Sequence, residues 1–191
     1  METLFQTRTS TIVAEAYPWS QCKESQRWSC FDQHSASPEV EVCQFLEAVV
    51  WLMKPAVVVE TGTSTGSSAA AIARGLQANR HGHLYSYELS RDKIEIATSF
   101  LHLEGILEEW VTFRQEDTMK VEWHNGKIDL FFSDGADDRY AEMRHFEPNF
   151  HERTVIVVHD ADNPAHDWKR CDYNQVKFST PVGLYLLQQR R

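Results

Sequence analysis

The chain has 191 residues, of which 42% are hydrophobic and 25% charged, a composition that fits one globular domain and excludes a disordered chain. Its formal net charge of −9 disfavours nucleic acid as a partner, because phosphate binding needs clustered lysine and arginine. No apolar run is long enough to cross a membrane, no secretory signal opens the chain and the four cysteines form no CxxC pair, so we expect a cytoplasmic protein with reduced thiols.

The N-terminal part of the chain shows no hydrophobic periodicity. Residues 1–36 are therefore predicted to be a short extension, and residues 37–191 to be the main domain. Ser37 and Pro38 are typical of a helix start, with the serine as the cap and the proline at the first helical position. Apolar residues then recur at helical spacing until Pro55, which ends the predicted helix.

After Pro55, short β-branched runs alternate with helical segments. Strands are predicted over 56–60, 83–88, 110–114, 128–133 and 154–159, and helices over 67–76, 91–103 and 140–146. This alternation implies parallel strands joined by right-handed crossovers, with helices on both faces. Two further strands, 176–179 and 184–188, flank Pro181 and Gly183 and predict an antiparallel hairpin. We therefore expect an α/β fold with a doubly wound, mostly parallel seven-stranded sheet of the Rossmann-like type.

Acidic residues follow the predicted parallel strands. In doubly wound sheets, ligands bind in the crevice at the carboxyl ends of the strands. Each of the five strands ends on or beside an acid: Glu60, Glu88, Asp117, Asp134 and Asp160. A single acid of this kind is better explained as a solvated surface carboxylate. The recurrence at successive strand ends indicates a ligand rich in hydroxyl and cationic groups.

The turn after the first strand has the sequence ETGTSTGSS over residues 60–68. Gly62 allows a tight turn, and Gly66 lets the next helix begin close to the strand. The dinucleotide fingerprint would require a glycine at Ser64, so that a pyrophosphate could approach the backbone. Its absence argues against NAD or FAD and favours a ligand without phosphates.

Three acids suggest which ligand this is. Glu60 would repel phosphate but suits an amino group, Glu88 could accept both hydroxyls of a ribose, and Asp117 could face the exocyclic amine of adenine. An amino acid, a ribose and an adenine together predict S-adenosylmethionine.

Residues 56–160 resemble the class I S-adenosylmethionine-dependent methyltransferases, in particular the catechol and caffeoyl-coenzyme A O-methyltransferase group. The first turn of that group has the form E-x-G-x-x-T-G-x-S, which this chain matches at Glu60, Gly62, Thr65, Gly66 and Ser68. The resemblance implies an S-adenosylmethionine-dependent O-methyltransferase of a small molecule. It also implies that Glu88 holds the ribose and that the first turn holds the methionine moiety, with Thr63 and Ser64 as further contacts.

The resemblance also implies a divalent cation such as Mg²⁺, held by an aspartate after the fourth strand and an Asp-Asn pair after the fifth. Asp134 and Asp160 match the two aspartates, and Asp134 would also border the cofactor. The asparagine of the family falls on Ala161, so that Asp162 or Asn163 would have to replace it. Such a metal would lower the pKa of a bound hydroxyl and orient it toward the methyl group.

The general base of the family has no direct equivalent. The family segment D-A-D-K-x-x-Y appears at residues 134–140 as DGADDRY, which keeps Tyr140 but has Asp137 in place of the lysine. His159 and His166 are candidate replacements, although a histidine at a strand end is more often a packed or capping residue.

Three side chains, Asp134, His159 and Asp160, are the candidates for the chemical site. Adjacent residues of a strand point to opposite faces, so His159 and Asp160 can serve one site only if the strand end is twisted or broken.

Other readings remain open for a chain with this pattern. A non-catalytic cofactor-binding module would explain the lost lysine, and a metal-dependent, hydroxylase-like tailoring enzyme could use the same aspartates. A nicotinamide-dependent oxidoreductase is a third reading, against which Ser64 argues. The pattern does not identify the methyl acceptor, and the apolar helix around 45–53 could form a homodimer interface.

Overall fold

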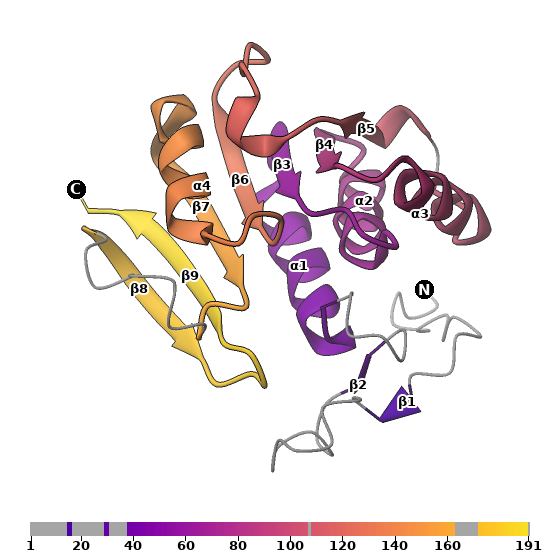
Figure 1. Cartoon of the computed structure of the whole chain (residues 1–191), viewed down its shortest axis with the longest axis horizontal. Helices are drawn as coiled ribbons and strands as arrows, with labels where there is room; N and C mark the ends of the chain where they lie inside the picture. Colours follow the sequence, from indigo (N-terminus) through magenta and orange to yellow (C-terminus); the bar gives the residue numbers. More distant parts are fainter. Residues whose placement is uncertain (1–14, 17–28, 31–37, 107, 163–171, 191) are drawn as a thin grey trace.

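A seven-stranded sheet forms the centre of the molecule (Figure 1). The computed structural model describes residues 15–16, 29–30, 38–106, 108–162 and 172–190. The strands follow the order β5-β4-β3-β6-β7-β9-β8. They are β3 (Val57–Thr61), β4 (His83–Glu88), β5 (Val111–Gln115), β6 (Ile128–Ser133), β7 (Phe150–His159), β8 (Tyr173–Phe178) and β9 (Leu184–Gln189).

Strands β3 to β7 pair in parallel, whereas β9 is antiparallel to both β7 and β8. The predicted doubly wound sheet with a C-terminal hairpin is therefore confirmed. The strand order reverses between β3 and β6, because β4 and β5 lie on one side of β3 and β6 and β7 on the other. Ligands of such sheets bind at this switch point, outside the carboxyl ends of the strands.

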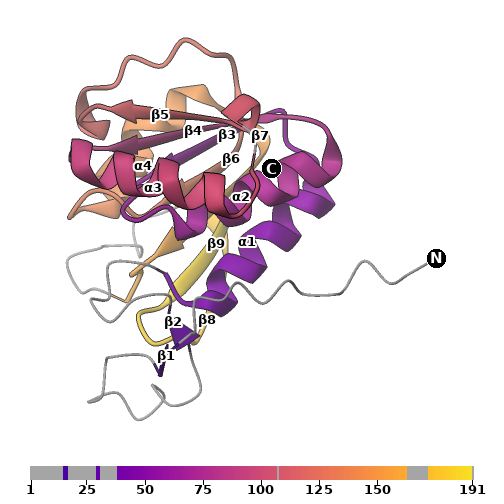
Figure 2. The same ribbon diagram turned by 90° about the vertical axis from the view of Figure 1, so that its right-hand side faces the viewer.

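Helices cover the two faces of the sheet unequally. Helices α1 (Val40–Met53), α2 (Ser67–Asn79) and α3 (Arg91–Leu103) lie along one face, and α4 (Arg139–Phe146) lies on the other (Figure 2). The side chains of β3 alternate between these two faces of the sheet. Val58 packs in the cluster that contains α1 and α2, and Val59 packs in the cluster that contains Met143 and Phe146 of α4. Successive side chains of a strand point to opposite faces, so both faces of β3 are buried.

Helix α1 begins later than expected. Its first residue is Val40, and Glu39 occupies the N-cap position in an extended conformation, so Pro38 is not the first helical residue; Ser37 lies outside the described residues. The extended backbone leaves the Glu39 side chain buried beside His159 instead of capping the helix. The helix ends as predicted, at a left-handed Lys54 that precedes Pro55.

Other elements were not predicted or differ in length. Strand β7 begins four residues earlier than expected, because Phe150 pairs with Ile128 before an irregularity in the ladder. Two-residue strands β1 (Glu15–Ala16) and β2 (Ser29–Cys30) form an antiparallel pair. The described residues also include the 3₁₀ turns η2 (Glu108–Trp110), η3 (Thr118–Lys120) and η4 (Glu147–Asn149). The division into residues 1–36 and 37–191 stays a prediction. In the described part of the chain, no helix has the length and apolarity of a membrane span.

Candidate active site

The loops after β3 and β6 meet at the switch point. Gly62 has φ of +81°, and a Cβ built there would lie 2.4 Å from the backbone oxygen of Asp134. A Cβ on Gly135 would lie 2.9 Å from the Gly62 nitrogen and 2.9 Å from the Thr61 Cβ. At this position, where the family resemblance would place alanine, a side chain would require the two loops of this chain to shift. Backbone contact therefore sets the geometry of the candidate cofactor turn.

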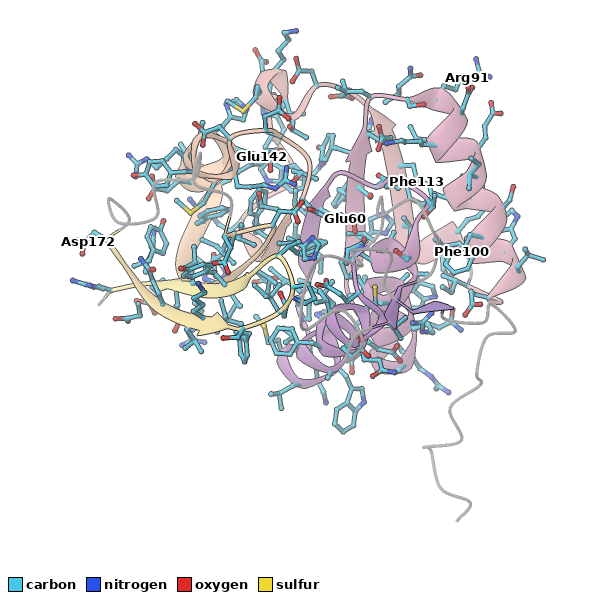
Figure 3. All side chains as sticks on the ribbon, turned by 60° about the horizontal axis from the view of Figure 1, so that its bottom comes forward. Glu60, Arg91, Phe100, Phe113, Glu142 and Asp172 are labelled. Atoms are coloured by element: carbon cyan, nitrogen blue, oxygen red, sulfur yellow. The ribbon has the colours of Figure 1, made fainter. Side chains whose placement is uncertain are left out.

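Glu60 lies at the centre of the molecule, buried in β3 (Figure 3). Its Oε2 accepts a 2.5 Å hydrogen bond from Ser86 Oγ, which is also 2.5 Å from Thr63 Oγ1. Burial raises the pKa of the Glu60 carboxyl to about 7, against the hydrogen bonds of Ser68 and Ser86, and the charges of Asp134 and Glu88 raise it further. Among the described residues, Glu60 Oε1 and Ser64 Oγ are buried polar atoms with no hydrogen-bond partner.

The raised pKa of Glu60 predicts a pH-dependent stability. Between pH 4.5 and about 7 the folded state retains a proton that the unfolded state has released, so this group makes the protein less stable as the pH rises through that window. In Glu60→Gln, an amide oxygen still accepts from Ser86 and the titration is removed. We expect the variant to gain up to about 3 kcal/mol in unfolding free energy relative to the parent across that window, measured by urea denaturation from pH 4.5 to 8.

Glu152→Gln is the control for this experiment, because Glu152 is exposed on β7. Its unfolding free energy should follow that of the parent chain at every pH. Parallel curves for the parent and Glu60→Gln would show that Glu60 titrates as an ordinary surface acid.

Glu88 joins the turn after β3 to the turn after β4. Its Oε2 accepts from the backbone N–H of Ser64 at 3.0 Å, and its Oε1 accepts from those of Leu89 at 2.9 Å and Ser90 at 3.0 Å. The carboxylate is half-buried, and these three donors leave one of its about four lone-pair sites free to accept a ribose hydroxyl. Ser64 itself has a positive φ, of +48°.

The other cofactor residues expected from the sequence lie on the same edge. Gly66 is the N-cap of α2 with φ of +89°, and a Cβ there would lie 2.8 Å from the Ala97 Cβ of α3. Ser68 is buried in the first turn of α2, where its hydroxyl lowers the pKa of the Glu60 carboxyl, while Thr65 is half-buried. Asp117 accepts from Met119 N at 3.0 Å and pairs with Lys120 at 2.8 Å, so it already caps a 3₁₀ turn. Its contact with adenine stays a prediction.

Glu142 of α4 is a site residue that the sequence analysis missed (Figure 3). It is fully buried, and its Oε2 accepts from Thr61 Oγ1 at 2.7 Å and Ser133 Oγ at 2.6 Å. Its Oε1 accepts from Thr118 Oγ1 at 2.7 Å and Ala136 N at 3.2 Å. The Glu142 carboxylate thus connects the ends of β3 and β6 to the turn after β5 through hydrogen bonds.

Replacing Glu142 by alanine should loosen this edge of the sheet. The change removes acceptors from three buried or half-buried hydroxyls and one backbone N–H, and unsatisfied groups of this kind cost about 1–3 kcal/mol each. We expect a loss of roughly 3–5 kcal/mol in unfolding free energy, measured by urea denaturation. Glu122→Ala, at an exposed acid in the segment before β6, should change stability by less than about 0.5 kcal/mol. Equal losses in the two variants would contradict the role given to Glu142.

A cluster of five charged side chains lies at the ends of β6 and β7. His159 Nδ1 is 3.2 Å from Asp134 Oδ1, and His159 Nε2 is 2.7 Å from Glu39 Oε2. Arg139 Nη2 donates to Asp134 Oδ1 at 2.9 Å and to Asp160 Oδ2 at 3.4 Å. Asp160 has φ of +56°, and this break in the strand brings the side chains of two successive residues, His159 and Asp160, to one site.

His159 links two carboxylates. Burial lowers the pKa of its ring, but the charge of Asp134 and the hydrogen bonds to Asp134 and Glu39 outweigh this and raise it to about 10. This environment favours an imidazolium over the free base that the sequence analysis considered. The catalytic role of His159 stays a prediction, and His166 and Asn163 lie outside the described residues.

The implied divalent cation fits these residues poorly. Asp134, His159 and Asp160 offer ligand atoms within 4.8 Å of one another. Both ring nitrogens of His159 face carboxylates, however, and Arg139 bonds both aspartates. Asp162, one of the two replacement ligands considered, pairs through its Oδ1 with Lys177 Nζ at 2.6 Å.

The chain resembles a known protein family in sequence and solved structures in fold. The family described as "Methyltransferase domain" matches residues 59–161, and no curated protein matches the chain in sequence. Among solved structures, the O-methyltransferase TomG of Streptomyces achromogenes, involved in tomaymycin synthesis and in complex with S-adenosylmethionine, is 19% identical with a TM-score of 0.67, covering 84% of this chain and 85% of that one.

Two further structures have the same fold. An O-methyltransferase of Bacillus cereus in complex with S-adenosylhomocysteine is 17% identical with a TM-score of 0.66, and the match covers 82% of this chain and 84% of that one. A candidate caffeoyl-CoA O-methyltransferase of Staphylococcus aureus is 13% identical with a TM-score of 0.69, over 81% of this chain and 85% of that one.

Proposed function

The chain belongs to the methyltransferase domain family, and from that premise we propose that it transfers the methyl group of S-adenosylmethionine to an oxygen atom of a small molecule. The cofactor would lie across the switch point, over the carboxyl ends of β3 and β4. The fold is shared with TomG in complex with S-adenosylmethionine and with the Bacillus cereus enzyme in complex with S-adenosylhomocysteine, which supports this placement.

The observation that carries the proposal is the pair of unpartnered polar atoms in the turn that begins at Glu60. Buried polar groups are nearly always hydrogen-bonded, and Glu60 Oε1 and Ser64 Oγ have no partner among the described residues. A zwitterionic amino acid moiety would supply what they lack, with its ammonium group donating to Glu60 and its carboxylate accepting from Ser64. Position 64 is a serine and not the glycine that would let a pyrophosphate approach the backbone, so the turn suits a ligand without phosphates.

The cofactor residues divide by the part of the ligand that they would hold. The methionine moiety would contact Glu60, Gly62, Thr63, Ser64, Thr65, Gly66 and Ser68. Glu88 would accept a ribose hydroxyl, Asp117 would face adenine, and Asp134 would border the methyl group. Such placement would position the methyl donor for in-line attack by an acceptor oxygen, and positioning accounts for much of the rate of such a displacement.

The acceptor would enter from the side of Asp134 and Asp160. Proton removal from an acceptor hydroxyl requires a carboxylate or another base within hydrogen-bond reach. Asp160 is the more exposed of the two aspartates, with 39% of its side chain accessible against 11% for Asp134. Asp160 is therefore our candidate for receiving the proton.

Calorimetry with S-adenosylhomocysteine tests the cofactor, and methyl transfer from labelled S-adenosylmethionine to a panel of catechols and sugars tests the reaction. We expect saturable binding of the nucleoside, no binding of NADH, and label in at least one hydroxylated acceptor. Binding without transfer to any acceptor would favour the non-catalytic module. No affinity for S-adenosylhomocysteine would overturn the proposal.

A further inference from the structure

We propose that Arg139 is the resident cation of this site, placed between Asp134 and Asp160, and that the chain therefore binds no divalent metal there. The inference rests on the proposed function only for its place in the reaction. The contacts that support the inference are those among the side chains of the cluster. Arg139 was not among the site residues expected from the sequence.

One nitrogen atom of Arg139 bridges the two aspartates. Nη2 carries two hydrogens, and it donates to Asp134 Oδ1 at 2.9 Å and to Asp160 Oδ2 at 3.4 Å. Nη1 donates to the backbone oxygen of Ala136, within the loop that leads from Asp134 to α4. The guanidinium is therefore held by three acceptors, two of them charged.

The backbone directs Arg139 inward. Arg139 is the first residue of α4, whose start is fixed by Asp138 Oδ1 accepting from Ala141 N at 3.0 Å. Arg139, Glu142, Met143 and Phe146 are the buried residues of this helix, spaced as one helical stripe. Only 9% of the Arg139 side chain is exposed, so the guanidinium belongs to the packed interior and not to a solvated surface pair.

The same contacts occupy the positions that a metal would need. Mg²⁺ requires near-octahedral oxygen ligands at about 2.0–2.1 Å. A dication placed between Asp134 and Asp160 would compete with the guanidinium for the same carboxylates and be repelled by it.

Among the residues that the structure describes, which do not include Asn163, the remaining side chains of the cluster do not complete a coordination sphere. Both nitrogens of the third potential ligand, His159, face carboxylates, one on Glu39 and one on Asp134. Ala161 offers no side-chain donor, and Asp162 pairs with Lys177. Asp134 and Asp160 together carry a charge of −2, and Arg139 reduces the net charge of the three groups to −1. A dication is therefore attracted less strongly than it would be by the two carboxylates alone.

Titration with Mn²⁺, a paramagnetic probe for Mg²⁺ sites, tests the proposal. Free Mn²⁺ is measured by electron paramagnetic resonance in the presence of the parent chain or of Asp160→Asn. We expect the two proteins to behave alike, with no saturable site of Kd below about 1 mM that depends on Asp160. EDTA should leave the melting temperature and the S-adenosylhomocysteine affinity of the parent unchanged.

A saturable Mn²⁺ site in the parent that disappears in Asp160→Asn would overturn the proposal. A site that is equally strong in both proteins lies elsewhere and leaves it standing. If S-adenosylhomocysteine fails to bind in any sample, the proposed function fails, whereas the Mn²⁺ result can still be read.

Removing the guanidinium provides the converse experiment. In Arg139→Gln the two aspartates lose their counter-charge, so Mn²⁺ should raise the melting temperature of this variant and not that of the parent. Arg144→Gln is the matched control, because Arg144 lies on the same helix with 54% of its side chain exposed and pairs with Glu147. Should Arg139→Gln fail to fold, the comparison of the parent with Asp160→Asn decides the question alone.

Discussion

Replacing Glu88 by alanine is expected to weaken S-adenosylhomocysteine binding by roughly 10- to 100-fold. If Glu88 accepts a ribose hydroxyl at its free lone-pair site, the change removes a hydrogen bond to a charged acceptor, worth about 1.5–3 kcal/mol. The carboxylate also holds the backbone N–H groups of Ser64, Leu89 and Ser90, so the turn itself should loosen. Calorimetry gives the affinity, and the melting temperature of the same sample separates binding from folding.

Glu95→Ala is the control for this experiment, since Glu95 is an exposed acid on α3 that pairs with Arg91 one turn away. It should bind S-adenosylhomocysteine as the parent chain does. If Glu88→Ala remains folded and binds with unchanged affinity, the ribose is held by other residues.

Gly62→Ala is expected to be the most disruptive single-methyl change in the site. The added Cβ would lie 2.4 Å from the Asp134 oxygen, and φ of +81° is itself costly for alanine. Overpacking typically costs about 1–3 kcal/mol and the backbone strain about 1–2 kcal/mol. We therefore expect about 2–5 kcal/mol of lost stability, measured by urea denaturation, together with a large loss of S-adenosylhomocysteine affinity, because the loops after β3 and β6 must separate.

The matched control is Gly126→Ala. Gly126 also has a positive φ, of +89°, but a Cβ there meets nothing within 4 Å. Gly126→Ala therefore introduces the backbone strain without a steric overlap. We expect it to lose only about 1–2 kcal/mol in unfolding free energy and to keep its affinity for S-adenosylhomocysteine. Similar losses in both variants would mean that the contact between Gly62 and Asp134 does not hold the two loops together.

Most of the fold could be predicted from local pattern. The bounds of β4, α3 and β6 agree with the predicted ranges, because each combines a clear hydrophobic period with polar residues at its ends. The parallel pairing followed from the alternation of strands and helices, and the hairpin from Pro181 and Gly183. Besides the start of α1, the errors lie at the end of α2, which continues to Asn79 instead of residue 76, and at the starts of β7 and β8. Strand β8 begins at Tyr173 instead of residue 176, and both strand starts are set by pairing with another strand.

The candidate site was predictable to a lesser extent. The acids that follow strands could be found because the topology brings the carboxyl ends of parallel strands to one edge. Glu142 and Arg139 carried a weaker signal, which was missed: they occupy the buried stripe of a helix, where charged residues are rare unless paired. Glu39 carried none, since its partner His159 lies 120 residues away.

The sequence by itself determined the strands of the sheet and the family, because hydrophobic period and a nine-residue turn are local properties of the chain, whereas the strand order and its switch point came from the structure. Tertiary structure alone decided which acids remain available for a ligand. Glu142 is used by Thr61, Ser133 and Thr118, and Asp134 and Asp160 are joined by Arg139. A carboxylate acts through the donors and charges within a few ångströms of it, and those neighbours come from strand ends that only folding brings together.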